Sequence, residues 1–168
     1  MFLLINLERP GYWKSNYFMN VNMTFEEYLD IYGKMTYRNV GVSMLPMLKQ
    51  DRDLFTVEKK TKKRCKKYDV VLYRRPPNQY VLHRVVKVRE KDYVILGDNC
   101  EKKEYGINDK DILGVVTSFI HKGKTVKSDA FFYQVYVHVW YWIYPFRRLY
   151  MCGKRHLKRL NRTDSQRN

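Results

Sequence analysis

Short runs of alternating apolar and polar residues dominate the chain between residues 53 and 126. Alternation over four to eight residues is typical of half-buried β-strands. Charged segments or turns with Pro, Asn or Gly separate the runs, which predicts local hairpins in a mainly β domain. The predicted strands are DLFTV, YDVVLYR, QYVLHRVVKV, DYVILG and DILGVVTSFI, and the predicted turns lie at residues 76–78, 90–92 and 121–124.

A helical pattern comes before this region, in MTFEEYLDIYGK at residues 23–34. Thr24 and Glu27 have the spacing of a capping box, and Gly33 can end the helix. The apolar residues that follow the cap fall on one face at helical spacing. We expect this short helix to lead directly into the loop that contains Ser43.

A second helical candidate is the aromatic segment FFYQVYVHVWYWIYPF, of which twelve of sixteen residues are Phe, Tyr, Trp or Val. A spanning helix needs about 20 apolar residues, whereas Tyr and Trp followed by basic residues favour a helix in the membrane interface. A true span and a helix packed on the core of the protein are the alternatives. The expected interface residues are Phe131, Phe132, Tyr136, Trp140 and Trp142.

The 168 residues, 45% of them hydrophobic, are enough for one domain with a real core and short appendages. We expect a weakly structured leader at residues 1–22, a β domain at 23–128, and an aromatic helix with a basic tail at 129–168. The N-terminal apolar run is too short for a signal peptide or a spanning helix. No cleavable signal peptide is therefore expected.

The chain carries 33 Lys and Arg against 17 Asp and Glu, a formal charge of +16. Such a charge predicts attraction to an anionic membrane or to nucleic acid, although the basic clusters at 59–67 and 147–167 are also typical of solvated arms. Because positive segments stay on the cytoplasmic side, we expect association with the cytoplasmic face of a membrane, with nucleic acid the less favoured partner.

Three widely spaced cysteines form no disulfide framework and no zinc motif. We therefore expect no metal and no cofactor. The candidate chemistry lies instead in GVSMLPML, which places Ser43 between apolar residues. A serine hydroxyl needs a positioned base to become a nucleophile.

His83 is the candidate base, because a neutral imidazole is the commonest general base near pH 7. It falls on an apolar strand face, where a core histidine is the alternative. Asp98 in ILGDN, or Glu104 six residues later, could orient the imidazole as the acid of a Ser/His/acid set. The sequence leaves open which of the two carboxylates takes this position.

Five segments between residues 39 and 124, namely GVSMLPML, KKYDVVLYRR, YVLHRVVKV, YVILGDN and DILGVVTSFIHKGK, resemble in order the conserved boxes of the type I signal peptidase family. The first box also occurs in related repressor-type serine/lysine peptidases. Both bacterial-type signal peptidases and repressor-type peptidases have a lysine base where this chain has His83. The chain is therefore similar to the endoplasmic-reticulum and archaeal type. The resemblance implies a signal-peptidase or repressor C-terminal-domain-like β fold.

The same resemblance implies Ser43 as nucleophile, His83 as base and an acid from the GDN region. Gly41 stands where the family often has a serine that assists the oxyanion hole, so one donor is expected to be missing. We expect no N-terminal anchor of the family's kind, and we expect the aromatic segment to replace it. Met44, Leu45 and Pro46 are expected to form an apolar wall towards substrate or lipid, with core packing as the alternative.

The predicted function is a serine endopeptidase that cleaves a signal or leader peptide from a precursor through an acyl-enzyme at Ser43. A cytosolic peptidase acting on a small precursor uses the same chemistry. The alternative is a non-catalytic basic protein that binds an anionic membrane or nucleic acid.

Overall fold

The computed structural model of the chain describes residues 23–150 and 152–154. The chain divides into two compact units, Met1–Ala130 and Phe131–Asn168, which are described separately below. The β domain and the aromatic helix predicted from the sequence fall in different units. The predicted leader at residues 1–22 lies outside the described residues.

The first element, α1 (Phe25–Tyr32), has the predicted capping box. The Thr24 backbone N–H donates to the Glu27 carboxylate at 2.7 Å, and the Glu27 N–H donates to the Thr24 hydroxyl at 3.2 Å. Gly33 ends the helix with a φ of 70°, which favours glycine. Phe25 and Leu29 are buried on its inner face. The helix and both of its ends are therefore confirmed.

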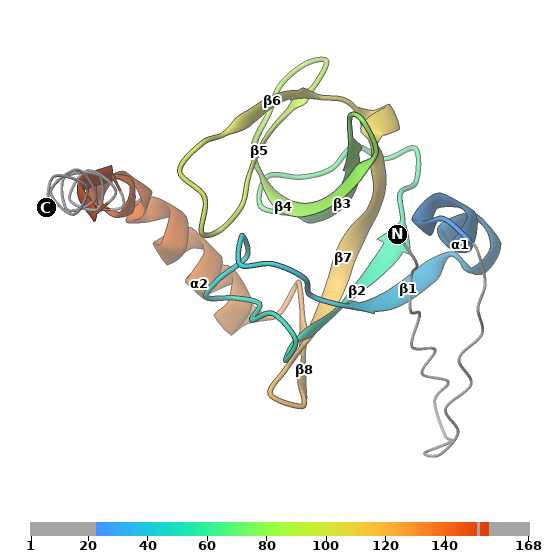
Figure 1. Cartoon of the computed structure of the whole chain (residues 1–168), viewed down its shortest axis with the longest axis horizontal. Coiled ribbons are helices and arrows are strands. Elements are labelled where there is room, and N and C mark those ends of the chain that lie inside the picture. Colours follow the sequence, from blue (N-terminus) through green and yellow to red (C-terminus); the bar gives the residue numbers. More distant parts are fainter. Residues whose placement is uncertain (1–22, 151, 155–168) are drawn as a thin grey trace, which may run out of the picture. The chain divides into compact units, whose positions relative to one another are not determined.

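Eight strands form one antiparallel sheet in the order β1-β2-β7-β3-β4-β5-β6, with β8 paired to β7 (Figure 1). A one-turn 3₁₀ helix, η1, precedes β7. The mainly β fold class is confirmed. The bounds are β1 Lys34–Arg38, β2 Leu54–Lys59, β3 Val70–Arg75, β4 Gln79–Val88, β5 Tyr93–Leu96, β6 Glu104–Ile107, η1 Asp109–Asp111, β7 Ile112–His121 and β8 Lys124–Lys127.

The five predicted strands correspond to β2, β3, β4, β5 and β7, and the three predicted turns lie between consecutive strands. Three short strands, β1, β6 and β8, were not predicted. The expectation that α1 leads directly into the serine loop is wrong, because β1 lies between them. This strand is held by pairing with β2, and the hydroxyls of Thr36 and Thr56 lie 2.9 Å apart across the pair. That partner is distant in the sequence, so local pattern carries little signal for β1.

The strands β3, β4, β5 and β6 curve into a ring that is closed on one side by β7 (Figure 1). Every residue of β5 is buried, as are the first four of β3. These central strands enclose an apolar cluster, whose burial helps to stabilise the unit. The cluster contains Cys65, Val71, Tyr73, Val85, Tyr93, Ile95 and Ile112.

The second unit begins with α2 (Phe131–Trp142), and residues 144–150 and 152–154 are also helical. The helix is interrupted at Ile143, because Pro145, two residues later, has no N–H to donate to the preceding turn. Within the described residues, no helix is both long enough and apolar enough to cross a membrane.

Candidate active site

Ser43 lies half-buried in the loop between β1 and β2, with exposed Val42 before it and buried Met44 after it. Met44 is only 1% exposed. It is part of the core rather than a wall towards substrate or lipid, so for this residue the packing alternative holds. Leu45 is half-buried and Pro46 is exposed, and they are joined by a cis peptide bond. Only these two of the predicted wall residues reach the surface.

Hydrogen bonds across its base hold the serine loop in shape. The buried Asn39 amide donates to the carbonyl of Gly41 at 3.2 Å and to that of Leu48 at 3.4 Å. The Gly41 N–H donates to the Gln50 side chain at 3.1 Å. Gly41 has a φ of 89°, in the left-handed region that disfavours other residues. Glycine here therefore fits the backbone of this loop, and its N–H is already engaged.

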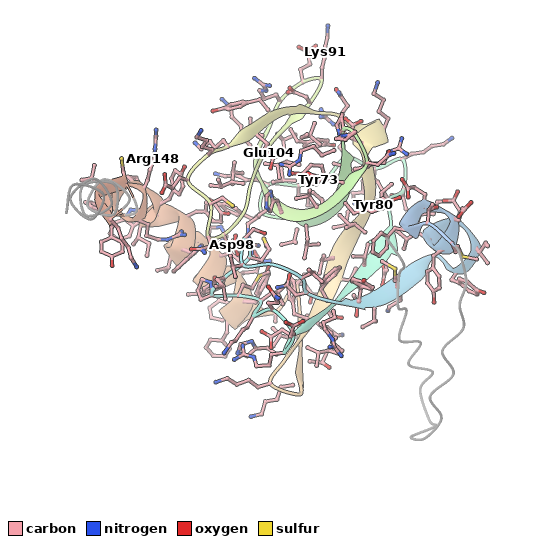
Figure 2. The ribbon with its side chains drawn as sticks, in the orientation of Figure 1. Tyr73, Tyr80, Lys91, Asp98, Glu104 and Arg148 are labelled. Carbon is pink, nitrogen blue, oxygen red and sulfur yellow. The ribbon has the colours of Figure 1, made fainter. Side chains whose placement is uncertain are left out.

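His83 is buried in β4, with 6% of its surface exposed. Its Nδ1 atom lies 3.2 Å from Oε1 of Glu104 and 3.3 Å from the hydroxyl of Tyr73. Tyr73 is fully buried in β3, and Glu104 is the first residue of β6. Figure 2 shows both side chains inside the ring of strands. Three strands therefore bring an imidazole, a carboxylate and a phenol together in the interior.

The pKa values of this group shift in opposite directions. Burial by itself lowers the pKa of His83, but the hydrogen bonds and charges of Cys100 and Glu104 outweigh it and raise the pKa. The hydrogen bond from His83 lowers the pKa of Glu104 to about 2, against the effect of burial. Burial, and then Glu104, raise the pKa of Tyr73. Glu104 is thus the anion that accepts hydrogen bonds from both partners.

With Glu104 as acceptor, the proton of the neutral imidazole lies on Nδ1 and the lone pair on Nε2. On the Nε2 side, Gly97 and Cys100 approach the ring. A Cβ atom placed on Gly97 would lie 2.8 Å from His83 Nε2 and 2.7 Å from Cys100 Sγ. Any side chain at Gly97 would therefore collide with the imidazole, and the Cys100 thiol lies beside its basic nitrogen.

The turn from Gly97 to Cys100 also holds the serine loop. The Asn99 N–H donates to the Ser43 carbonyl at 2.7 Å, and the Asn99 amide donates to the Val42 carbonyl at 3.2 Å. The turn itself is closed by the Cys100 N–H, which donates to the Gly97 carbonyl at 2.9 Å. One tight turn thus contacts the backbone of Ser43 and the ring of His83.

In the described part of the chain, no hydrogen bond joins the Ser43 hydroxyl to His83. Hydrogen bonds between nucleophile and base are commonly long in ligand-free sites and shorten when substrate binds.

Asp98 faces away from His83. It forms a bidentate ion pair with Arg84, at 2.9 Å to Nε and 2.7 Å to Nη2, and both side chains are fully buried. Neighbouring residues of a strand point to opposite faces, so the partner of Arg84 lies on the other side of β4 from His83. The prediction of Asp98 as a catalytic acid is therefore wrong, and Glu104 is the carboxylate that contacts His83.

Arg84 connects this ion pair to the serine loop. Its Nη2 also donates to Met47 Sδ at 3.0 Å, and its Nη1 donates to the Tyr68 carbonyl at 3.0 Å. The guanidinium thus joins the loop after Ser43, the segment before β3 and the turn after β5. These hydrogen bonds from Arg84 replace the hydrogen bonds to water that its guanidinium loses on burial.

Three residues of this region were not predicted to belong to the site: Tyr73, Arg84 and Cys100. Tyr73 lies in a predicted strand, but its contact with His83 depends on the register of β3 with β4, which a single sequence does not fix. Arg84 directly follows His83, and Cys100 lies two residues after Asp98; only this closeness in the sequence was a signal.

Among the residues that the structure describes, no group of three or more His, Cys, Asp and Glu side chains could hold a metal ion.

The predicted membrane-interface residues divide into two sets. Phe131, Phe132 and Trp142 are strongly exposed. Tyr136 and Trp140 are half-buried and stack on each other with ring centroids 5.9 Å apart.

Comparison with known proteins finds no relative: no family model, no curated protein and no solved structure matches the chain.

Proposed function

We propose that the chain is a serine endopeptidase of the signal-peptidase type, which cleaves a signal or leader peptide from a precursor. Ser43 is the nucleophile, His83 the general base and Glu104 the carboxylate that orients the base. The observation that carries this proposal is the turn from Gly97 to Cys100, which contacts both the Ser43 backbone and the basic side of His83. The hydrogen bond between His83 Nδ1 and Glu104 also supports the proposal, because it leaves the lone pair of the imidazole on Nε2, which faces that turn.

In the first step the Ser43 oxygen bonds to a peptide carbonyl carbon, and its proton moves to His83 Nε2. The carbon–nitrogen bond then breaks, and His83 gives the proton to the leaving amine. In the second step water attacks the acyl carbon and gives a proton to His83. The bond between that carbon and the Ser43 oxygen then breaks, and His83 returns the proton to the Ser43 oxygen. Glu104 stabilises the imidazolium in both steps and stays ionised, in keeping with its lowered pKa of about 2.

The Ser43 backbone N–H is the proposed oxyanion donor. The neighbouring Gly41 offers no hydroxyl, and its N–H is bonded to Gln50. Loss of one oxyanion donor costs on the order of 100-fold in rate. The proposed enzyme is therefore slower than one with a serine at this position.

The proposed reaction takes place at the cytoplasmic face of a membrane. The charge of +16 supports an anionic surface as partner. A precursor that is itself membrane-bound would be held there next to the enzyme.

The alternative is a non-catalytic protein whose basic segment at residues 59–67 binds nucleic acid or lipid. Part of this charge is already engaged: Lys60 Nζ lies 2.8 Å from Asp109, and Arg64 lies 3.5 Å from the same carboxylate. A steep decrease of oligonucleotide affinity with salt, together with absent peptidase activity, would support this alternative.

The test is cleavage of a precursor peptide with a signal or leader sequence by the full chain. Ser43→Ala and His83→Ala should each abolish cleavage, while Ser118→Ala in β7 and His138→Ala in α2 retain it. Circular dichroism checks that all four variants fold. Cleavage at the wild-type rate by either Ser43→Ala or His83→Ala would overturn the proposal.

A further inference from the structure

The second unit carries a continuous exposed apolar stripe. Its members are spaced alternately by three and four residues, so they fall on one face of a helix. Phe132 is 85% exposed and Trp142 is 78% exposed. A stripe of this length on a surface marks an interaction site. The exposed members are Phe132, Val135, Val139, Trp142, Phe146 and Leu149.

The stripe keeps its direction across the interruption at Ile143. The Ile143 N–H donates to the Val139 carbonyl at 3.1 Å, and the Arg147 N–H donates to the Ile143 carbonyl at 3.1 Å. Both bonds join residues four apart, as in an α-helix. Residues on either side of the break therefore keep the helical register, and the exposed side chains form one surface.

Basic side chains lie on the same helical segment as this surface. The Arg147 guanidinium lies 3.5 Å from the centre of the Trp140 ring and donates to the Trp140 carbonyl at 3.3 Å. Arg148, labelled in Figure 2, is exposed. No Asp or Glu occurs between residues 131 and 163 of the sequence. A surface that binds the stripe must therefore be compatible with positive charge that no acidic residue of this segment balances.

Spacing of three and four is also that of a coiled-coil seam, so a second copy of the chain is a competing occupant. Two such helices would bring cations against cations, with no acidic residue between positions 131 and 163 to pair with them. An anionic lipid surface supplies the missing negative charge, and its headgroup zone accommodates Trp and Phe rings.

We propose that α2 and the helical residues 144–150 lie flat in the interface of an anionic membrane. The exposed stripe enters the boundary between headgroups and acyl chains, and the basic residues contact lipid phosphates. An apolar face with aromatic residues, combined with cations on the rest of the helix, is the pattern of interfacial helices. This inference rests on the second unit alone and does not depend on the peptidase chemistry.

The experiment measures flotation of the full chain with vesicles of phosphatidylcholine alone, or of phosphatidylcholine with one quarter phosphatidylglycerol. The stripe variant combines Trp142→Asp with Phe146→Asp. The control combines Ile31→Asp with Tyr105→Asp, because both residues are exposed and apolar, lie in the other unit and give the same change in charge. Light scattering gives the mass of each protein in solution.

The expected result is binding to the anionic vesicles that is about tenfold or more weaker for the stripe variant, with the control within about threefold of wild type. Equal binding of the stripe variant and wild type would overturn the proposal. Equal binding of wild type to both vesicle types would also overturn it. So would a wild-type protein that is dimeric in solution and floats with neither vesicle type, when the stripe variant is monomeric. Peptide cleavage in solution should be unchanged in the stripe variant, which separates this inference from the proposed function.

Discussion

Nδ1 of His83 lies 3.2 Å from Oε1 of Glu104, inside the sheet and next to the turn that holds Ser43. The pair joins the middle of β4 to the start of β6, two strands that are not neighbours in the sheet. Together with Cys100, the contact raises the pKa of His83 against the effect of burial, and it lowers the pKa of Glu104 to about 2. Most of what we expect from this site follows from that contact.

The first prediction concerns the pH dependence of peptide cleavage. His83 must be neutral to act as base, so activity should rise with pH through a pKa above the ordinary value of 6.5. Glu104→Gln removes the anion that favours imidazolium, and should move this rise to lower pH. It should also reduce kcat by about 100-fold, because the imidazolium is no longer stabilised. Glu90→Gln, at an exposed site, is the control. An unmoved profile in Glu104→Gln would contradict the assignment.

The second prediction concerns stability in acid. A carboxylate whose pKa is lowered from 4.5 to about 2 contributes stability that is present above pH 4.5 and lost as the pH falls to about 2. His83 is protonated in both the folded and unfolded states throughout this window, so its own titration does not interfere. Urea unfolding should therefore show a steeper loss of the free energy of unfolding in wild type than in Glu104→Gln. Equal slopes would count against the lowered pKa.

The third prediction compares two aspartates that pair with arginines. Asp98→Asn leaves the fully buried Arg84 without its counter-charge, and should lower the free energy of unfolding by about 3–5 kcal/mol. Asp92→Asn breaks the exposed pair with Arg89 and should cost much less. Urea titrations of both variants test this difference. An equal decrease in the free energy of unfolding in both variants would show that burial of the Arg84–Asp98 pair does not increase the cost of breaking it.

The fourth prediction tests the close approach of Gly97 to His83. In Gly97→Ala the new methyl would lie 2.8 Å from Nε2, so the imidazole must move. A shift of about 1 Å costs on the order of 100-fold in rate, so cleavage should fall by that amount while the strands remain. Gly153→Ala, where a Cβ meets nothing within 4 Å, is the matched control. Wild-type cleavage by folded Gly97→Ala would show that the ring position is not critical.

The sequence predicts the longer strands because each of them alternates within its own residues, as in QYVLHRVVKV, which matches β4 from end to end. It does not predict β1 or β6. The short strand β1 is held by β2, which is distant in the sequence, and the short strand β6 is held by β5 across an irregular pairing. Propensity alone carries little information for such edges.

The same distinction applies to the site. The sequence places Ser43 in a loop and His83 on a buried strand, but leaves the acid open between two residues. The side to which Asp98 points is set by its pairing with Arg84, and that depends on sheet register rather than on spacing. For the same reason Tyr73, which is 10 residues from His83 in the chain, could not be assigned to the site.

The most direct test of the central claim, that His83 activates Ser43, is the rate at which a fluorophosphonate probe labels the full chain. We predict that peptide mapping finds the label on Ser43 and that His83→Ala slows labelling by about 100-fold or more, while His138→Ala leaves it unchanged. Labelling of Ser43 at the same rate in wild type and His83→Ala, or no labelling of a folded wild-type chain, would contradict it.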